Sequence, residues 1–222
     1  MTLTVVGVVC ALASEARHLG SDDGTLLAVS GMGGSAAAQS ATALVGAGAT
    51  ALASWGMAGG LDPSLAAGTI FLPDEVLAPE GAPIATAREW RERLASALAT
   101  QRPVTQGRLL TSRTAIGSPA EKATLFRTTG AVAVDMESLA VAEVASAHQL
   151  PFIAVRVIVD SAADALPRAV TAAADNEGHL QIWRLMAALA RTPADLAPLL
   201  RLASRYRAAN RSLAAVARVG LS

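Results

Sequence analysis

Short apolar runs alternate along the chain with longer segments in which apolar positions recur at helical spacing. This alternation is typical of a mixed or parallel sheet that is covered by helices. The predicted strands are 3–11, 25–30, 50–56, 68–72, 105–112, 131–135 and 152–159. The predicted helices are 13–19, 34–47, 87–100, 119–127, 137–148 and two or three more beyond residue 178.

Two stretches follow neither period. Segment 73–86 contains Pro and Gly and is predicted to be an ordered loop. Segment 164–179 is the most loop-like part of the chain, and we expect it to be a mobile loop near a site. At 222 residues the chain is long enough for one sizeable core. We therefore predict a single domain over residues 1–222, with a helical tail over about 180–222.

Composition narrows the class of protein. Hydrophobic residues make up 52% of the chain and charged residues 16%, yet no uninterrupted apolar stretch is long enough to span a membrane. The first residues lack the basic region of a signal peptide, and the single cysteine, Cys10, cannot form an intramolecular disulfide, so we expect a cytoplasmic protein. Cys10 itself is expected to be a small buried residue of the first strand.

The ionisable residues exclude two kinds of partner. Basic and acidic residues are balanced at 18 each, so we expect no nucleic acid to bind. The three histidines lie at positions 18, 148 and 179, which is no metal-ligand spacing, so we expect no metal and no cofactor.

Six predicted strands end in polar or glycine-rich groups. In sheets of this kind, ligands bind beyond the carboxyl ends of the strands. Several polar ends in one sheet therefore indicate a ligand pocket rather than chance. The groups are Glu15, Ser30–Gly34, Gly56–Gly60, Thr111–Thr114, Asp135–Glu137 and Asp160–Ser161.

The glycine-rich segment "SGMGGSAAAQ" joins the second predicted strand to a helix. Its backbone amides, at Gly31 and Gly33, suit an anion or a sugar hydroxyl. The alternative is a tight turn whose glycines let the helix pack closely. The dinucleotide fingerprint is not met, because Ala36 stands where its last glycine should be.

The carboxylates can be interpreted in two ways. Asp160 ends the most strand-like run, "PFIAVRVIVD", where burial would let it hold a proton near neutral pH; alternatively it caps the next segment. Glu15 is either a site carboxylate or an acid in the first turn of a helix. Arg156 is expected to pair with a buried acid. A switch from strand to helix after Asp135 would free Glu137 to reach a pocket and leave Asp135 as a cap or ion-pair partner.

Taken together, the motifs resemble the purine nucleoside phosphorylase and nucleosidase family. They are "VVGVVCALASEA", "VSGMGGSAAA", "GMAGGLDPSLAAGTIFLPDEV", "AVAVDMES" and "PFIAVRVIVDSAAD", in the family's order over most of residues 3 to 165. Within it, the chain is most similar to the methylthioadenosine/S-adenosylhomocysteine nucleosidase branch. Within that branch the chain looks most like the hopanoid-associated phosphorylases. The segments that support this narrower resemblance are "ALASEAR", "SPAEKATL" and the Arg-rich tail.

The resemblance implies a fold, a reaction and roles for named residues. The fold is a three-layer α/β/α sandwich with a mixed central sheet, and the reaction cleaves the N-glycosidic bond of an adenine nucleoside, with adenosylhopane as the substrate implied by the narrower likeness. The catalytic residues would be Asp160, the acid that protonates the base; Glu137, which binds the ribose hydroxyls; and Glu15, which orients the attacking water. Substrate contacts would come from Met136, Gly31, Met57, Gly59, Ala115 and Ile116.

The nucleophile stays open between water and inorganic phosphate. The nucleosidases carry a Ser where this chain has Met57, and the arginine that larger phosphorylases supply after the third strand is absent from "SWGMAGG". Gly33, Arg17 or Arg113 would bind phosphate if it is a co-substrate. The alternatives for Arg17 and Arg113 are a solvated helix cation and a loop cation.

The Arg-rich tail and the family resemblance predict possible partners of the chain. The tail "LLRLASRYRAANRSLAAVARVG" is either an amphipathic helix packed on the sheet or a transient contact with the inner face of an anionic membrane. The family resemblance implies a homodimer. Two other functions compete with this interpretation. One is a nucleosidase that acts on methylthioadenosine or S-adenosylhomocysteine. The other is a non-catalytic nucleoside-binding module, although such a module would gain little from an acid at the place where the base departs.

Overall fold

The computed structural model describes residues 5–20, 24–78, 80–99, 103–165 and 196–221. Within these residues, ten strands form one mixed sheet. The strands are β1 Val6–Cys10, β2 Thr25–Val29, β3 Ala51–Gly60, β4 Ile70–Phe71, β5 Glu75–Leu77, β6 Ile84–Ala85, β7 Val104–Thr105, β8 Arg108–Thr111, β9 Ala131–Asp135 and β10 Phe152–Asp160.

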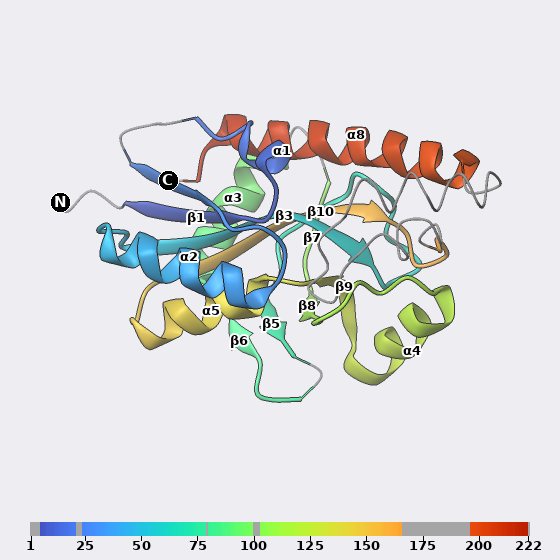
Figure 1. The fold of residues 1–222 in the computed structure, drawn as a ribbon, viewed down its shortest axis with the longest axis horizontal. Helices are drawn as coiled ribbons and strands as arrows, with labels where there is room; N and C mark the ends of the chain where they lie inside the picture. The colour runs from blue at the N-terminus through green and yellow to red at the C-terminus, as the bar shows by residue number, and fades with distance from the viewer. Residues whose placement is uncertain (1–4, 21–23, 79, 100–102, 166–195, 222) are drawn as a thin grey trace.

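Strand β3 is the centre of the sheet (Figure 1). Along one edge it pairs in parallel with β10, from Leu52 to Gly59. The opposite edge is shared, because β1 pairs in parallel with residues 51–55 and β9 pairs antiparallel with Gly59 and Gly60. A strand buried on both faces is largely apolar, and eight of the ten residues of β3 are buried, with Ser54 as its one polar side chain.

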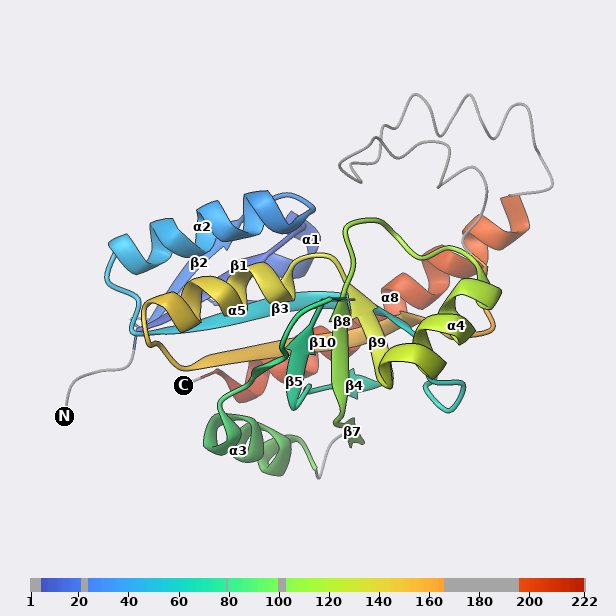
Figure 2. The ribbon, with the colours of Figure 1, turned by 90° about the horizontal axis from the view of Figure 1, so that it is seen from below.

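Helices cover both faces of the sheet (Figure 2). Helices α2 (Gly34–Gly46) and α5 (Ser138–Ala147) pack on one face, where their alanines meet Leu52, Ala154 and neighbouring strand residues. Helices α3 (Arg88–Leu98) and α8 (Leu196–Val219) pack on the other face, together with the short α1 (Ala13–Ala16). This arrangement is the predicted three-layer sandwich.

Helix α4 (Pro119–Thr129) has clear sequence signals at both ends. The Ser118 hydroxyl accepts a hydrogen bond from the backbone N–H of Glu121 at 3.4 Å, and Pro119 occupies the first turn. Gly130 ends the helix in the left-handed conformation, with φ of 66°. These signals fix the register of α4 and therefore the direction in which Lys122 points.

Several predicted boundaries are wrong. Strand β3 continues to Gly60 instead of ending at residue 56, because its glycines allow close neighbours instead of making a turn. The predicted loop 73–86 contains β5 and β6, which pair with each other and, through β5, with β8. The predicted strand 105–112 is divided into β7 and β8 at Gly107, whose φ of 136° suits glycine.

The tail prediction is tested only from residue 196. There α8 buries Ala209, Leu213 and Val216 against the sheet and exposes four arginines, as expected of an amphipathic helix; these are Arg201, Arg207, Arg211 and Arg218. The predicted elements between 178 and 195, and most of the predicted loop 164–179, lie outside the described residues. Among the described helices, none is long and apolar enough to cross a membrane.

Two glycines provide a matched test of this packing. A Cβ at Gly7 would lie 2.9 Å from both Ala49 Cβ and Leu52 Cδ2, whereas a Cβ at Gly46 would meet nothing within 4 Å. We expect Gly7→Ala to lower the free energy of unfolding by about 1–3 kcal/mol through overpacking. Gly46→Ala should raise it by up to about 1 kcal/mol, because it restricts the unfolded chain. Urea denaturation measures both, and equal effects would contradict the packing of β1 described above.

Candidate active site

Glu15 lies against the peptide between Gly56 and Met57 of β3, which pairs with neither β1 nor β9. Its Oε1 accepts a hydrogen bond from the Met57 N–H at 3.1 Å, and its Oε2 accepts one from the Leu12 N–H at 3.1 Å. A Cβ at Gly56 would lie 2.9 Å from Oε1, so glycine is needed for this approach. Burial raises the pKa of Glu15, while Arg156 and the backbone N–H groups oppose the rise.

Glu137 lies at the break between β9 and α5. The strand ends at Asp135 and the helix begins at Ser138, so the strand alternation stops there, as predicted, and Glu137 contacts Gly33, beyond the end of β2. Its Oε1 accepts a hydrogen bond from the Gly33 N–H at 3.0 Å. Burial raises the pKa of Glu137 to about 7, and the nearby charge of Asp135 adds to the rise.

Arg156 is the buried cation beneath these two acids. Its guanidinium pairs with Asp135 Oδ2 at 2.7 Å from Nη2 and donates to the Ser54 and Ser138 hydroxyls at 2.6 and 2.9 Å. Asp135 also accepts hydrogen bonds from the Thr111 hydroxyl at 2.7 Å and from the Ser138 N–H at 3.1 Å. Both predictions are therefore confirmed: Arg156 pairs with a buried acid, and Asp135 is an ion-pair partner that also caps α5.

Asp160 lies at the end of β10, opposite Gly59 on the other edge of β3. A register shift after Ile158 inserts one extra residue, and a Cβ at Gly59 would stand 3.4 Å from Asp160 Oδ1. Asp160 Oδ2 pairs with the ammonium of Lys122, which is completely buried. Burial raises the pKa of Asp160, and the charge and hydrogen bond of Lys122 oppose the rise.

The structure distributes the other predicted residues over several segments. Met136 and Arg113 line an open cavity of about 870 Å³ between α2, α5 and the end of β8. Met57 supplies the backbone N–H that binds Glu15, and Gly31 has a φ of 82° that suits a glycine turn. Ala115 and Ile116 lie on one loop, where Ala115 is exposed and Ile116 packs into the core.

The residues predicted to hold phosphate are not brought together. The Gly33 N–H is bound to Glu137, and Arg17 is exposed, with its Nε donating to the Ser14 carbonyl at 3.0 Å. Arg113 is exposed on the 870 Å³ cavity. In the described part of the chain, no group of three or more His, Cys, Asp or Glu side chains could hold a metal ion.

Sequence reasoning missed Lys122. In helix α4 it shares a face with Leu125 and Phe126, which pack against a core cluster, and a cation at such a position was the available signal. Cys10 is buried as expected, and burial, followed by the charge of Glu15, raises the pKa of its thiol to about 12. It is therefore an inert thiol.

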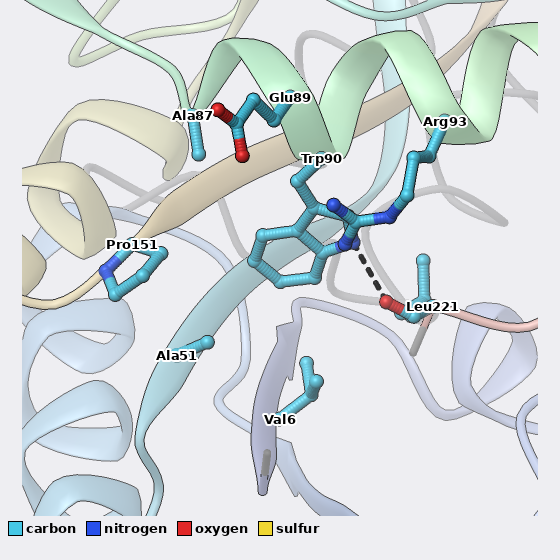
Figure 3. Close-up of a pocket in the computed structure, with 8 residues that line it drawn as sticks. All are labelled: Val6, Ala51, Ala87, Glu89, Trp90, Arg93, Pro151 and Leu221. Atoms are coloured by element: carbon cyan, nitrogen blue, oxygen red, sulfur yellow. Dashed lines mark hydrogen bonds between the residues drawn. The ribbon is translucent and has the colours of Figure 1, made fainter. Parts of the chain in front are cut away.

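A second cavity lies at the opposite end of the sheet (Figure 3). It has a volume of about 260 Å³ and lies beside Val6 and Ala51, where β1 and β3 begin. The Trp90 Nε1–H donates to the Leu221 carbonyl at 2.7 Å and closes one side. This cavity is far along the strands from the three acids, which lie at or beyond the ends of β1, β9 and β10.

The buried pair predicts a large stability effect. Arg156→Met would leave the Asp135 carboxylate buried without its cation, which costs about 3–5 kcal/mol in the free energy of unfolding at neutral pH. The matched control is Arg88→Met, which breaks an exposed pair with Glu92 at 2.7 Å and should leave the free energy of unfolding almost unchanged. Chemical denaturation of both variants measures the difference, and a small loss in Arg156→Met would show that the pair is not the centre of the site.

The sequence and the fold are similar to those of known proteins. The family model of the phosphorylase superfamily matches residues 19–192, whereas comparison with curated proteins gives no significant match. The 5′-methylthioadenosine/S-adenosylhomocysteine nucleosidase of Helicobacter pylori is similar in structure, with a TM-score of 0.71 and 15% identity over 97% of this chain and 98% of that chain.

Two further solved structures share the fold. Futalosine hydrolase of Helicobacter pylori has a TM-score of 0.66, with 17% identity over 91% of this chain and 98% of that chain. The methylthioadenosine/S-adenosylhomocysteine nucleosidase of Streptococcus pneumoniae has a TM-score of 0.63, with 19% identity over 72% and 87% of the two chains. The motifs, the fold and the family match agree, and the chain belongs to the phosphorylase superfamily of enzymes.

Proposed function

We propose that this protein cleaves the N-glycosidic bond of an adenine nucleoside by hydrolysis. The observation that carries the proposal is that three carboxyl groups, Glu15, Glu137 and Asp160, lie at or beyond the ends of three strands that all pair with β3, and burial raises the pKa of each. Acids held in this way at the mouths of strands are typical of a catalytic site. The similar nucleosidases and futalosine hydrolase support the reaction class.

Each acid is assigned one task. As the C1′–N9 bond breaks, its electron pair moves to the base, and a proton passes from Asp160 to the purine N7. Glu137, held by the Gly33 N–H, accepts hydrogen bonds from the ribose hydroxyls, which strengthen as positive charge develops on the sugar. Glu15 takes the proton of the water that adds to C1′.

Water is favoured over phosphate by the distribution of charge. In the described part of the chain the buried cations are Arg91, Lys122 and Arg156, and each pairs with a carboxylate. A phosphate dianion at C1′ would therefore meet the carboxylate of Glu15 with no buried cation free to balance it. The same carboxylate is well suited to activating water.

The substrate is proposed in finer detail as a nucleoside with an apolar 5′ group, with adenosylhopane as the specific candidate. The cavity beside Met136 is lined in part by Ala38, Leu139 and Ala140, which would contact an apolar group, while Glu80, Arg113 and Glu143 supply charged groups to the same cavity. A lipid-linked substrate would bring the exposed arginines of α8 toward an anionic membrane. We propose a homodimer as the assembly.

An adenine-release assay tests the proposal. The wild-type protein should release adenine from adenosylhopane faster than from adenosine, methylthioadenosine or S-adenosylhomocysteine, at the same rate with and without phosphate, and with no ribose 1-phosphate product. Glu15→Gln should lower kcat by about 10²–10⁴-fold through loss of the general base. Glu92→Gln, an exposed acid of α3, is the matched control and should keep full activity.

The outcomes of this assay separate the alternatives. Phosphate-dependent release with ribose 1-phosphate would replace hydrolysis by phosphorolysis. Preference for methylthioadenosine would discard the lipid substrate, and tight nucleoside binding without release would favour a binding module.

The raised pKa of Glu137 predicts a pH dependence. Glu137 must be ionised to accept the ribose hydroxyls, so kcat/KM should rise as the pH increases through about 7. Glu137→Gln carries no titrating group, so the rise near pH 7 should disappear and the plateau should fall. The measurement is a pH profile of adenine release for both proteins, and an acidic limb that persists in Glu137→Gln would assign that limb to another group.

A further inference from the structure

Lys122 is a buried ammonium whose hydrogen bonds all lead to the segment that carries Asp160. It projects from α4, has no exposed surface, and donates to Asp160 Oδ2, to the Ser161 carbonyl at 2.9 Å and to the Asp164 carbonyl at 3.1 Å. These three acceptors match the three N–H donors of an ammonium group. The geometry therefore fixes Lys122 against one oxygen of Asp160 and leaves Oδ1 for another partner.

The charges around Asp160 come from three elements in the described part of the chain. Lys122 of α4 contacts the carboxyl directly, while Asp164, beyond the end of β10, and Arg205 of α8 act from farther away. Asp164 is itself neutralised, because its Oδ2 pairs with Arg205 at 2.7 Å and accepts hydrogen bonds from Ser161. Lys122 is consequently the dominant charge on Asp160.

A purely structural role explains this arrangement poorly. Replacing a buried ion pair by apolar residues is often neutral or stabilising, so a lysine whose only task was packing would gain little from its charge. An acid that must release a proton has a different requirement. A buried carboxyl without a cation holds its proton too tightly, because its charged form is poorly solvated.

We propose that Lys122 is a positioning residue that sets the acid strength of Asp160. In the reaction, Asp160 gives its proton to the purine N7 as the C1′–N9 electron pair moves onto the base, and the carboxylate left behind is stabilised by the Lys122 ammonium, which keeps its own protons. Water addition to C1′ then releases a proton to Glu15, which passes it to solvent, and Asp160 regains one from solvent. This inference rests on the proposed function.

The first test follows the carboxyl itself and needs no activity. The Asp160 carboxyl is titrated by ¹³C NMR in the full-length protein and assigned by the loss of its signal in Asp160→Asn. In Lys122→Met its titration should move upward by about one to three pH units, because the opposite charge is removed. Lys122→Gln, which keeps hydrogen-bond donors without charge, should move it in the same direction. Arg127→Met removes an exposed cation of the same helix and should leave it unchanged.

The second test compares two leaving groups. Adenine needs a proton to depart, whereas 4-nitrophenolate leaves a ribose as a stable anion. Lys122→Met should lower adenine release by about 10–100-fold and shift the alkaline limb of its pH profile upward. Cleavage of 4-nitrophenyl riboside should stay within about threefold of wild type, which also shows that the variant is folded.

The outcomes distinguish this inference from the function on which it rests. An unmoved Asp160 titration, or an equal loss with both leaving groups, would overturn the role of Lys122 while adenine release by the wild type stood. A wild-type protein that released no adenine from any nucleoside would overturn the proposed function and, with it, the role of Lys122 as a positioning residue in that reaction.

Discussion

The pairing of Arg156 with Asp135 is the interaction on which the site depends. Arg156 is 2% exposed and stands in the middle of β10, where a cation is tolerated only because its donors find Asp135, Ser54 and Ser138. The same contacts join β10, β9, β3 and the first turn of α5. The strand-to-helix break that presents Glu137 is thus held by the ion pair, since Asp135 both neutralises Arg156 and caps the helix.

The site contains more buried acid than its apolar surroundings would accept without compensation. Arg156 lowers the cost of ionising Glu15 and Glu137, and Lys122 does the same for Asp160. The two cations act on different acids, so these acids can hold different protonation states within one small region. Such separation of tasks by environment is what an acid and a base need at the same pH.

Much of this arrangement could be predicted from the sequence, because local residue patterns determine it. Strand β9 has the predicted bounds 131–135, and the pairing of Arg156 followed from the rule that a charge in a buried strand needs a partner. The course of β3 through Gly60 could not be predicted in this way. Glycines normally indicate a turn, and pairing with β9 and β10, both distant in sequence, keeps these glycines extended.

The same limit applies to short strands and to Lys122. Strands β5 and β6 are too short for a period of two to show, and their place is set by pairing with β8. Lys122 is 38 residues from Asp160 in the chain, and a lysine in a helix is normally solvated.

The distribution of cations also argues for the nature of the nucleophile. A phosphorolytic site needs a positive group that stays available beside the sugar, and its guanidinium or ammonium cannot also neutralise a structural acid. Here the described buried cations are each committed to a carboxylate, and the Gly33 N–H binds Glu137. Phosphate would have to displace one of these contacts and leave a buried acid unpaired. Water, being neutral, would enter beside Glu15 without that cost, so the same electrostatics that hold the fold together support the proposed hydrolysis.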